Sequence, residues 1–212
     1  EKFRMGDKQA FLKQFDSIPA VFPLQGKARA QIHNGLDFPT TRDEYWKYTR
    51  VNSILDTDYQ ENDWQPDSIQ NYAISGLESI DVVFVNGVYS SELSSSSERT
   101  GLTVGSILNQ DSENRQLVLD HLGKYADSEK HAFNAFNTSY FKDGAFIRVT
   151  KNTDIKTPIR ILNLSSGTNQ ANNLRNLILV EENARVQILG HSTGTELKDG
   201  FVNVVTEISV GE

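Results

Sequence analysis

A pentapeptide near the end of the 212-residue sequence has the spacing of a serine nucleophile. The stretch Gly190-His191-Ser192-Thr193-Gly194 matches the G-x-S-x-G elbow, in which a strand leads into a sharp turn and then a helix. Only the six residues Thr195–Gly200 precede the next strand-like stretch, which leaves no room for that helix. The histidine of a triad should also follow the serine, yet no histidine lies beyond His191. The sequence therefore predicts a polar turn between strands here and no catalytic serine.

Other groups that could perform acid–base or metal chemistry are scattered along the chain. The remaining histidines, His33, His121 and His131, form no H-x-x-x-H pair and have no carboxylate at ligand spacing, so we expect structural or surface roles. Glu181 and Glu182 are adjacent, and adjacent strand residues point to opposite faces, so the two acids should not converge, and we expect a solvated turn. We therefore predict no catalytic, no cofactor-binding and no metal-ligating residue in this chain.

The composition excludes several classes of protein. The sequence has no cysteine, which removes disulfides, thiolate nucleophiles and thiolate metal sites. A formal charge of -7 disfavours binding to nucleic acid, and no G-x-x-x-x-G-K-[ST] or G-x-G-x-x-G loop is present to hold a nucleotide. There is no run of about 18 apolar residues and no leader, so we expect a cytoplasmic protein without membrane contact. Because the chain starts at Glu1 and a strand-like alternation is still running at Val210, we expect a fragment.

The elements that would position any site fall into three regions. Residues 1–55 are predicted to be an α-helical amino-terminal region. Its first helix is indicated by an apolar stripe at i, i+4 and i+7, formed by Phe11, Phe15 and Ile18. Pro19 and Pro23 should end that helix, and a second helix is expected over Lys27–Ile32.

A cluster of aromatic residues follows these helices. Thr41 and Glu44 have the spacing of a capping box, which predicts a short helix or helical turn over Asp43–Tyr48. Trp46 and Tyr48 would then form either a small satellite core or a docking surface.

Residues 56–143 are predicted to be a mixed α/β connector. A strand over Ile80–Val85 runs into Asn86-Gly87, a strong hairpin signal, and Val88 and Tyr89 begin the return strand. Ser94–Ser97 should be a polar loop. Apolar periodicity predicts helices over Leu117–Tyr125 and Ala132–Tyr140.

Residues 144–212 are rich in β signals and repeat themselves. Ile147-x-Val149-x-x-Asn152-x-x-Ile155 recurs 31 residues later as Ile178-x-Val180-x-x-Asn183-x-x-Val186, and a third copy starts at Ile208. Asn152 and Asn183 should lie at turns, because asparagine tolerates the left-handed backbone region. The pattern predicts a mainly β fold that starts a single-stranded parallel β-helix, a solenoid, although an antiparallel sheet could produce the same echo by chance.

Period-2 alternation within this region predicts which side chains point inward. The expected inward set is Val186, Ile188, Val202, Val204, Ile208 and Val210. The expected outward set is Arg148, Arg185, Gln187, Asn203 and Glu207.

Four stretches resemble the SufB/SufD family of iron–sulfur cluster assembly proteins. Phe38–Thr49, read as F-P-T-T-R-D-E-Y-W-K-Y-T, is similar to a P-T-x-x-D-E-x-W-x-Y-T signature of the SufD branch. Val83–Gly87 resembles the family's F-V-N/D-G hairpin. Ala132–Thr138 with Asp143–Ile147 resembles its passage into the β region, and Ile178–Glu212 resembles its repeats. The resemblance covers nearly the whole chain and favours SufD over SufB.

This resemblance implies a scaffold subunit and not an enzyme. It implies partnership with SufB and the ATPase SufC, or a SufD homodimer, in a SufBCD complex that handles an iron–sulfur cluster, with ATP bound by SufC. The family's interfacial cysteine and histidine and its SufC-binding helices would lie beyond Glu212, so none of those residues is assigned here.

Two other functions remain open at this point. A carbohydrate-active β-helix enzyme gathers carboxylates on one face, but the outward set above contains a single acid, Glu207, and forms no acidic ladder. A protein-binding solenoid of unrelated role is the second alternative.

Overall fold

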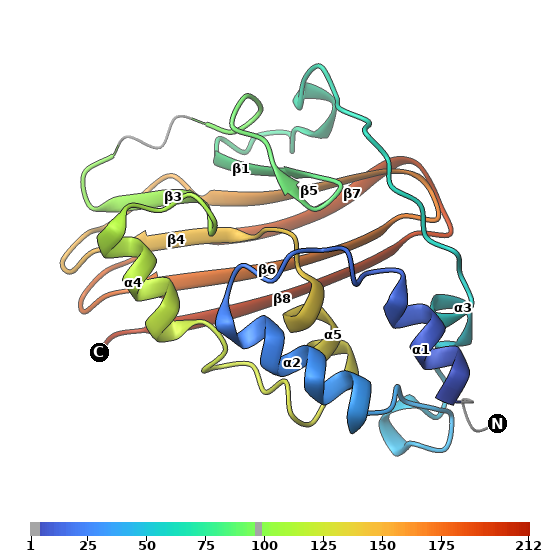
Figure 1. Cartoon of the computed structure of the whole chain (residues 1–212). Coiled ribbons are helices and arrows are strands. Elements are labelled where there is room, and N and C mark those ends of the chain that lie inside the picture. Colours follow the sequence, from blue (N-terminus) through green and yellow to red (C-terminus); the bar gives the residue numbers. More distant parts are fainter. Residues whose placement is uncertain (1–4, 96–98) are drawn as a thin grey trace.

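Two four-stranded β-sheets face each other and carry helices on one side (Figure 1). The computed structural model describes residues 5–95 and 99–212. The first sheet has the order β2-β1-β5-β7 and consists of β1 (Ile80–Val85), β2 (Val88–Tyr89), β5 (Ile159–Thr168) and β7 (Ile188–Lys198). The second has the order β3-β4-β6-β8 and consists of β3 (Leu102–Ser106), β4 (Ala145–Val149), β6 (Ala171–Val180) and β8 (Phe201–Val210).

Each sheet mixes parallel and antiparallel pairs. In the first sheet β1 pairs with β2 in antiparallel fashion, whereas β1, β5 and β7 are parallel. In the second, β3 pairs with β4 in antiparallel fashion, whereas β4, β6 and β8 are parallel. The predicted hairpin is confirmed, since Val85 lies opposite Val88 across Asn86-Gly87.

The predicted fold class, a mainly β chain that starts a parallel β-helix, is wrong. The described residues form two mixed sheets with packed helices, which is an α/β fold, and they form no solenoid. The 31-residue echo is instead a register within one sheet, in which Ile147 pairs with Ile178 and Ile178 pairs with Ile208. Such an echo reports only that neighbouring strands share an offset. It carries no information about the antiparallel partners β2 and β3 or the helices.

The core between the sheets follows from the period-2 alternation of the strands. Alternate residues of both sheets meet there, and the largest set consists of Ile80, Val82, Phe84, Leu102, Val104, Ala145, Ile147, Val149, Ile159, Ile161, Leu174, Ile178 and Val180. The turns between the long strands use asparagine as expected, because Asn152 and Asn183 have φ of 62° and 52°. The amide of Asn183 donates to Asn152 Oδ1 at 2.9 Å, so the two turns are stacked.

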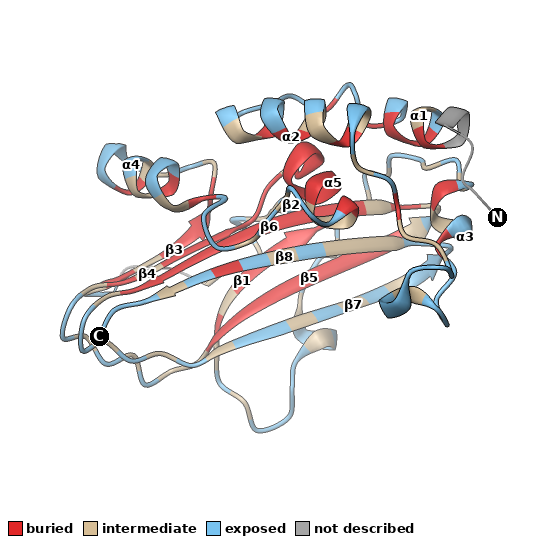
Figure 2. Cartoon of the chain, turned by 90° about the horizontal axis from the view of Figure 1, so that it is seen from below, coloured by how far each residue is buried: buried red, intermediate tan, exposed pale blue. Residues whose placement is uncertain are grey.

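Helices cover the outer face of the second sheet. They are α1 (Met5–Lys13), α2 (Pro23–Asn34), α3 (Asn52–Leu55), α4 (Ser112–His121) and α5 (Ala132–Tyr140). Figure 2 shows α5 buried beneath α1 and α2, and α5 contacts both β6 and β8. Val118 and Leu122, in and beside α4, pack on Leu177 and Leu179 of β6. The helix predicted over Ala132–Tyr140 is confirmed.

The amino-terminal helices differ from prediction in their ends. The helix α1 stops at Lys13, and turns then bring Phe15 and Ile18 into the same buried cluster as Phe11. Pro23 was expected to end a helix, but it begins α2. A proline is tolerated in a first helical turn because the N–H it lacks would have no partner there.

Two 3₁₀ turns lie in the loops, η1 (Glu44–Trp46) and η2 (Gln70–Tyr72). The predicted helical turn over Asp43–Tyr48 is confirmed by η1, although its N-cap is Asp43 and not Thr41. The connector around η2 packs Trp64, Ile69 and Tyr72 on the outer face of the first sheet. The predicted polar loop Ser94–Ser97 lies partly outside the described residues, which omit 96–98.

The last strand keeps the predicted alternation, but its burial differs from the prediction. Val204, Ile208 and Val210 share the inter-sheet face with Leu174, Ile178 and Val180 but are 41%, 53% and 69% exposed, since β8 is the edge strand. Glu207 was predicted to face solvent, but it is buried on the opposite, helix-covered face. Helices cover this face, and the periodicity of a strand does not show which of its faces a helix covers.

Candidate functional site

A buried ion pair joins the two last strands of the second sheet. Arg175 of β6 donates to Glu207 Oε1 of β8 from Nε at 2.9 Å and from Nη2 at 2.7 Å. Both side chains are fully buried. Burial lowers the pKa of the Arg175 guanidinium, and the Glu207 carboxylate opposes that shift. An uncompensated charge at this depth would be costly, so each group requires the other.

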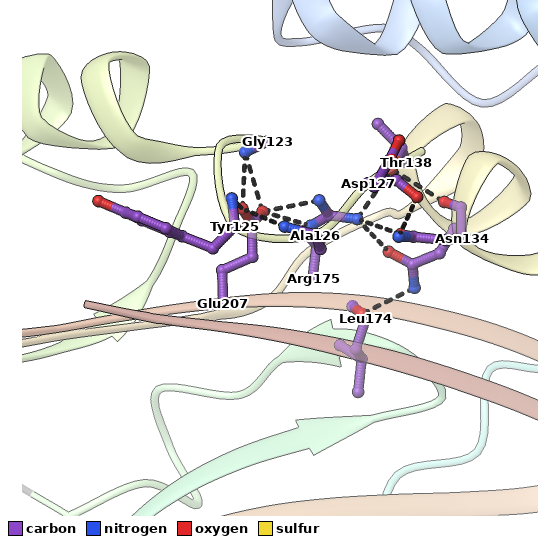
Figure 3. Close-up of polar contacts among 10 residues, drawn as sticks. Gly123, Tyr125, Ala126, Asp127, Asn134, Thr138, Leu174, Arg175 and Glu207 are labelled. Atoms are coloured by element: carbon purple, nitrogen blue, oxygen red, sulfur yellow. Dashed lines mark hydrogen bonds and ion pairs between the residues drawn. The ribbon is translucent and has the colours of Figure 1, made fainter. Parts of the chain in front are cut away.

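The loop after α4 wraps its backbone around the same carboxylate (Figure 3). The N–H groups of Gly123 and Tyr125 donate to Glu207 Oε2 at 3.0 and 2.8 Å, and that of Ala126 donates at 3.3 Å. Gly123 has a backbone φ of +87°, which residues other than glycine rarely adopt. Converging backbone N–H groups form an anion-binding concavity, which the protein's own glutamate fills.

The other end of Arg175 reaches α5. Its Nη1 donates to Thr138 Oγ1 at 2.8 Å and to Asn134 Oδ1 at 3.1 Å (Figure 3). Asn137, also in α5, donates to the carbonyls of Leu174 at 2.9 Å and Asn203 at 2.8 Å. The network therefore fastens α5 and the 123–126 loop to β6 and β8, and its full burial leaves no room for a substrate.

A second polar cluster joins three helical segments. His33 Nε2 lies 2.9 Å from Tyr140 Oη, and that hydroxyl donates to Asp16 Oδ1 at 3.0 Å. The guanidinium of Arg29 lies over the Tyr140 ring, 4.8 Å from its centroid. Burial raises the pKa of Tyr140 well above its ordinary value, and Asp16 adds to the rise. A phenol held this firmly in its neutral form is a poor base and nucleophile, so the cluster is suited to joining the turn after α1 to α2 and α5.

The G-x-S-x-G stretch does not form an elbow. Residues 190–194 lie inside β7, where Ser192 is paired with Asn163 of β5. The predicted polar turn is therefore wrong as well. A Cβ on Gly194 would lie 2.5 Å from the carbonyl of Ser165, so this glycine serves the close approach of two strands and not a nucleophile turn.

The adjacent acids follow the end of β6 at Val180 and lie outside the strands, and their carboxylates pair with different cations, so they do not converge. Glu181 Oε1 accepts from Arg148 Nε at 2.8 Å, while Glu182 Oε2 accepts from Lys151 Nζ at 2.7 Å. Over the described ranges 5–95 and 99–212, no three His, Asp or Glu side chains are grouped so that they could hold a metal ion.

A buried acid marks the passage from α5 into β4. Asp143 accepts from Ser106 Oγ at 2.7 Å and from the backbone N–H groups of Gly144 and Tyr89 at 2.8 and 3.1 Å. Burial raises the pKa of Asp143, while these donors lower it. A Cβ on Gly144 would lie 1.8 Å from the carbonyl oxygen of Arg175, so only glycine fits. The D-G pair thus brings the chain against β6 beside the buried arginine.

Sequence reasoning missed both polar clusters. Arg175 and Glu207 are 32 residues apart, and His33 and Tyr140 are 107 residues apart. One signal was available in the lone glutamate within the apolar alternation of 201–210, although periodicity alone placed it on a solvent face.

None of the helices within the described part of the chain combines the length and the apolar character needed to cross a membrane.

The fold and its polar clusters define an α/β domain in which helices are clamped onto one of two facing sheets by buried ionic and hydrogen-bonded networks. The chain belongs to the SufBD family, because the profile of the SufBD protein N-terminal region matches residues 12–161. It is also similar to an iron–sulfur cluster assembly SufBD family protein of Synechocystis sp., with 28% identity over 228 aligned residues. That alignment includes 97% of this chain and 48% of the relative, so the chain spans about half of the relative's length.

Proposed function

We propose that this chain is the amino-terminal region of a scaffold subunit in cytoplasmic iron–sulfur cluster assembly. The observation that carries the proposal is the match of residues 12–161 to the SufBD N-terminal region. The relative's name, an iron–sulfur cluster assembly protein, supports the same role. Within the family we assign the chain to the SufD branch, on the P-T-T-R-D-E-Y-W-K-Y-T stretch at residues 39–49.

The contribution of this region is architectural. The most buried charged residues, Arg175 and Glu207, are fully engaged with each other and with α5 and the 123–126 loop. Because the 212 residues contain no cysteine, the thiolates that would hold a nascent cluster must come from other parts of the full assembly. The cluster is therefore cargo of the complex, and this region supports the parts that handle it.

Strand edges provide a means of association. The strands β7 and β8 end their sheets, so each has one edge without a strand partner among the residues that the structure describes. Open edges present backbone donors and acceptors that pair readily with further strands. This feature supports a subunit that works within an assembly, with SufB and the ATPase SufC as its proposed partners and ATP bound by SufC.

Affinity co-purification tests the proposal. The full-length protein carrying a tag is expressed together with SufB and SufC from the same organism, and we expect both to elute with it after a wash in 0.5 M salt. Recovery of the tagged, folded protein alone, while SufB and SufC associate with each other, would contradict the proposal. The fold is checked in the same sample by circular dichroism.

The two alternatives, a carbohydrate-active β-helix enzyme and a protein-binding solenoid, both require a β-helix. The described residues form two mixed sheets, so neither alternative is supported.

A further inference from the structure

Two tyrosines, Tyr45 within η1 and Tyr48 just after it, are almost completely exposed. Tyr45 and Tyr48 are 96% and 91% exposed, whereas Trp46 between them is half-buried. Large aromatic side chains normally bury much of their surface, and neighbouring exposed rings are typical of binding sites. The satellite core expected from the sequence therefore includes Trp46 only.

The segment that presents these tyrosines is held in a defined conformation. The Asp43 carboxylate accepts from the Thr40 backbone N–H at 2.6 Å, and the Trp46 and Thr49 N–H groups close successive turns at 2.9 Å. The Trp46 ring packs on Phe133 of α5, with centroids 5.4 Å apart. A surface that is ordered before binding loses less conformational entropy when a partner docks.

A cleft of about 440 Å³ opens next to Tyr45. It is lined by residues 37–40, by Asp43, Tyr45 and Trp46, and by residues 130–133 at the start of α5. Phe38 and Phe133 provide an apolar wall, and their rings are in contact at 5.0 Å between centroids. The cleft is therefore suited to one apolar side chain of a partner.

Three cations and two acids lie in the stretch 42–50 around the tyrosines, because Asp43 and Glu44 are exposed there as well. Arg42, Lys47 and Arg50 are exposed, and none forms an ion pair with a carboxylate in the described part of the chain. The Lys47 ammonium lies 5.5 Å from the centre of the Tyr48 ring. With Asp43 and Glu44 included, the stretch 42–50 has a formal charge of +1, against -7 for the whole chain, and the Asp43 carboxylate already accepts from the Thr40 backbone N–H. Electrostatic complementarity favours an acidic partner at the patch, while the net charge disfavours a long polyanion.

We propose that Arg42, Tyr45, Lys47, Tyr48 and Arg50, called here the aromatic–basic patch, bind an acidic peptide segment of another protein that inserts one apolar side chain into the cleft beside Trp46. The carboxylates of the segment pair with the three cations, and its backbone lies across the two tyrosine rings. The patch lies on the helical side of the molecule, in the light-blue turn below α1 and α2 in Figure 1. This docking function is independent of the role in cluster assembly.

Fluorescence anisotropy with defined peptides tests the proposal. The probes are labelled 14-residue peptides in which Asp and Glu flank a single Leu, Ile or Phe at varied positions. Peptides with Lys in place of the acids, peptides without the apolar residue, and a 15-nucleotide oligo-dT serve as comparisons. We expect the anchored acidic peptides to bind the whole chain at least about tenfold more tightly than each comparison.

Two patch variants and one matched control locate the binding. The variants are Y45A/Y48A and R42E/K47E/R50E, and each should weaken the acidic peptides by about tenfold or more. The control K13E/K124E/K198E makes the same change in net charge at exposed lysines elsewhere and should leave the affinity within about twofold. All the substituted side chains are exposed, so thermal unfolding should report an unchanged fold.

An NMR measurement adds a readout that does not depend on any variant. The chain has two tryptophans, Trp46 beside the cleft and Trp64 on the first sheet. Peptide binding should shift the indole N–H signal of Trp46 and leave that of Trp64 in place. The proposal is overturned if no acidic peptide exceeds its basic counterpart, if the control triple variant weakens binding as much as the patch variants, or if oligo-dT binds more tightly than the peptides.

Discussion

Glu207→Gln is the substitution that most directly tests the buried network. Glu207 neutralises Arg175 across contacts of 2.7 and 2.9 Å, and both side chains are fully buried. Glutamine keeps the size of the side chain but removes its charge, which leaves the guanidinium without a counterion. Removal of one partner from a buried ion pair costs about 3–5 kcal/mol. For a chain of this length the loss corresponds to a fall of about 10 °C in melting temperature.

Urea denaturation followed by circular dichroism measures this loss of stability. Glu182→Gln is the matched control, because Glu182 pairs with Lys151 at a similar distance while both side chains are more than half exposed, and it should cost under about 1 kcal/mol. Combining Arg175→Met with Glu207→Gln should recover about 2 kcal/mol relative to the sum of the single effects. If Glu207→Gln costs no more than Glu182→Gln, the ion pair does not stabilise the fold as we argue.

Further predictions concern pH and close packing. Burial would raise the pKa of Asp81, but hydrogen bonds from Arg160 and Ser79 outweigh it and hold that pKa below its usual range. The resulting stability is present above the unfolded pKa of about 3.9 and is lost as pH falls through the folded pKa, so Asp81→Asn should flatten the loss of stability below about pH 4 in urea titrations. An acid limb as steep as that of the wild type would contradict this assignment. Gly144→Ala should cost roughly 3 kcal/mol or more, because its Cβ would meet the Arg175 carbonyl at 1.8 Å, whereas Gly190→Ala, with open space at its Cβ, should be nearly neutral. Equal melting temperatures for these two alanine variants would refute the packing argument.

Local signals in the sequence predicted individual elements well. The Asn86-Gly87 pair fixed the hairpin between β1 and β2, and the apolar spacing within Ala132–Tyr140 gave α5. The turn asparagines Asn152 and Asn183 adopt the positive φ that their side chains tolerate. These features depend on residues that are near each other in the chain, so the sequence carries them directly.

Long-range features could not be predicted in the same way. The repeat near Ile147 and Ile178 correctly indicated a shared strand offset, but the antiparallel pairing of β3 with β4 joins segments about 45 residues apart and carries no periodic signal. Glu207 was placed on a solvent face because alternation does not show which face a helix covers. The charge is buried only because Arg175 and the 123–126 loop arrive from elsewhere in the fold.

The candidate patch was partly visible in the sequence. For the aromatic residues of the 45–48 stretch, the sequence left a satellite core and a docking surface as alternatives. In the structure one aromatic ring is packed and the other two are exposed. Trp46 packs on Phe133, whereas Tyr45 and Tyr48 remain in solvent. The division depends on α5, which is about 85 residues further along the chain.

Native mass spectrometry of the co-expressed assembly tests the proposed scaffold role most directly. The full-length protein, SufB and SufC are purified through a tag on SufC, so that the protein is recovered only if it joins the complex. We predict one dominant species whose mass requires all three polypeptides. A dominant species of SufB and SufC alone, with the folded full-length protein left in the unbound fraction, would contradict the account.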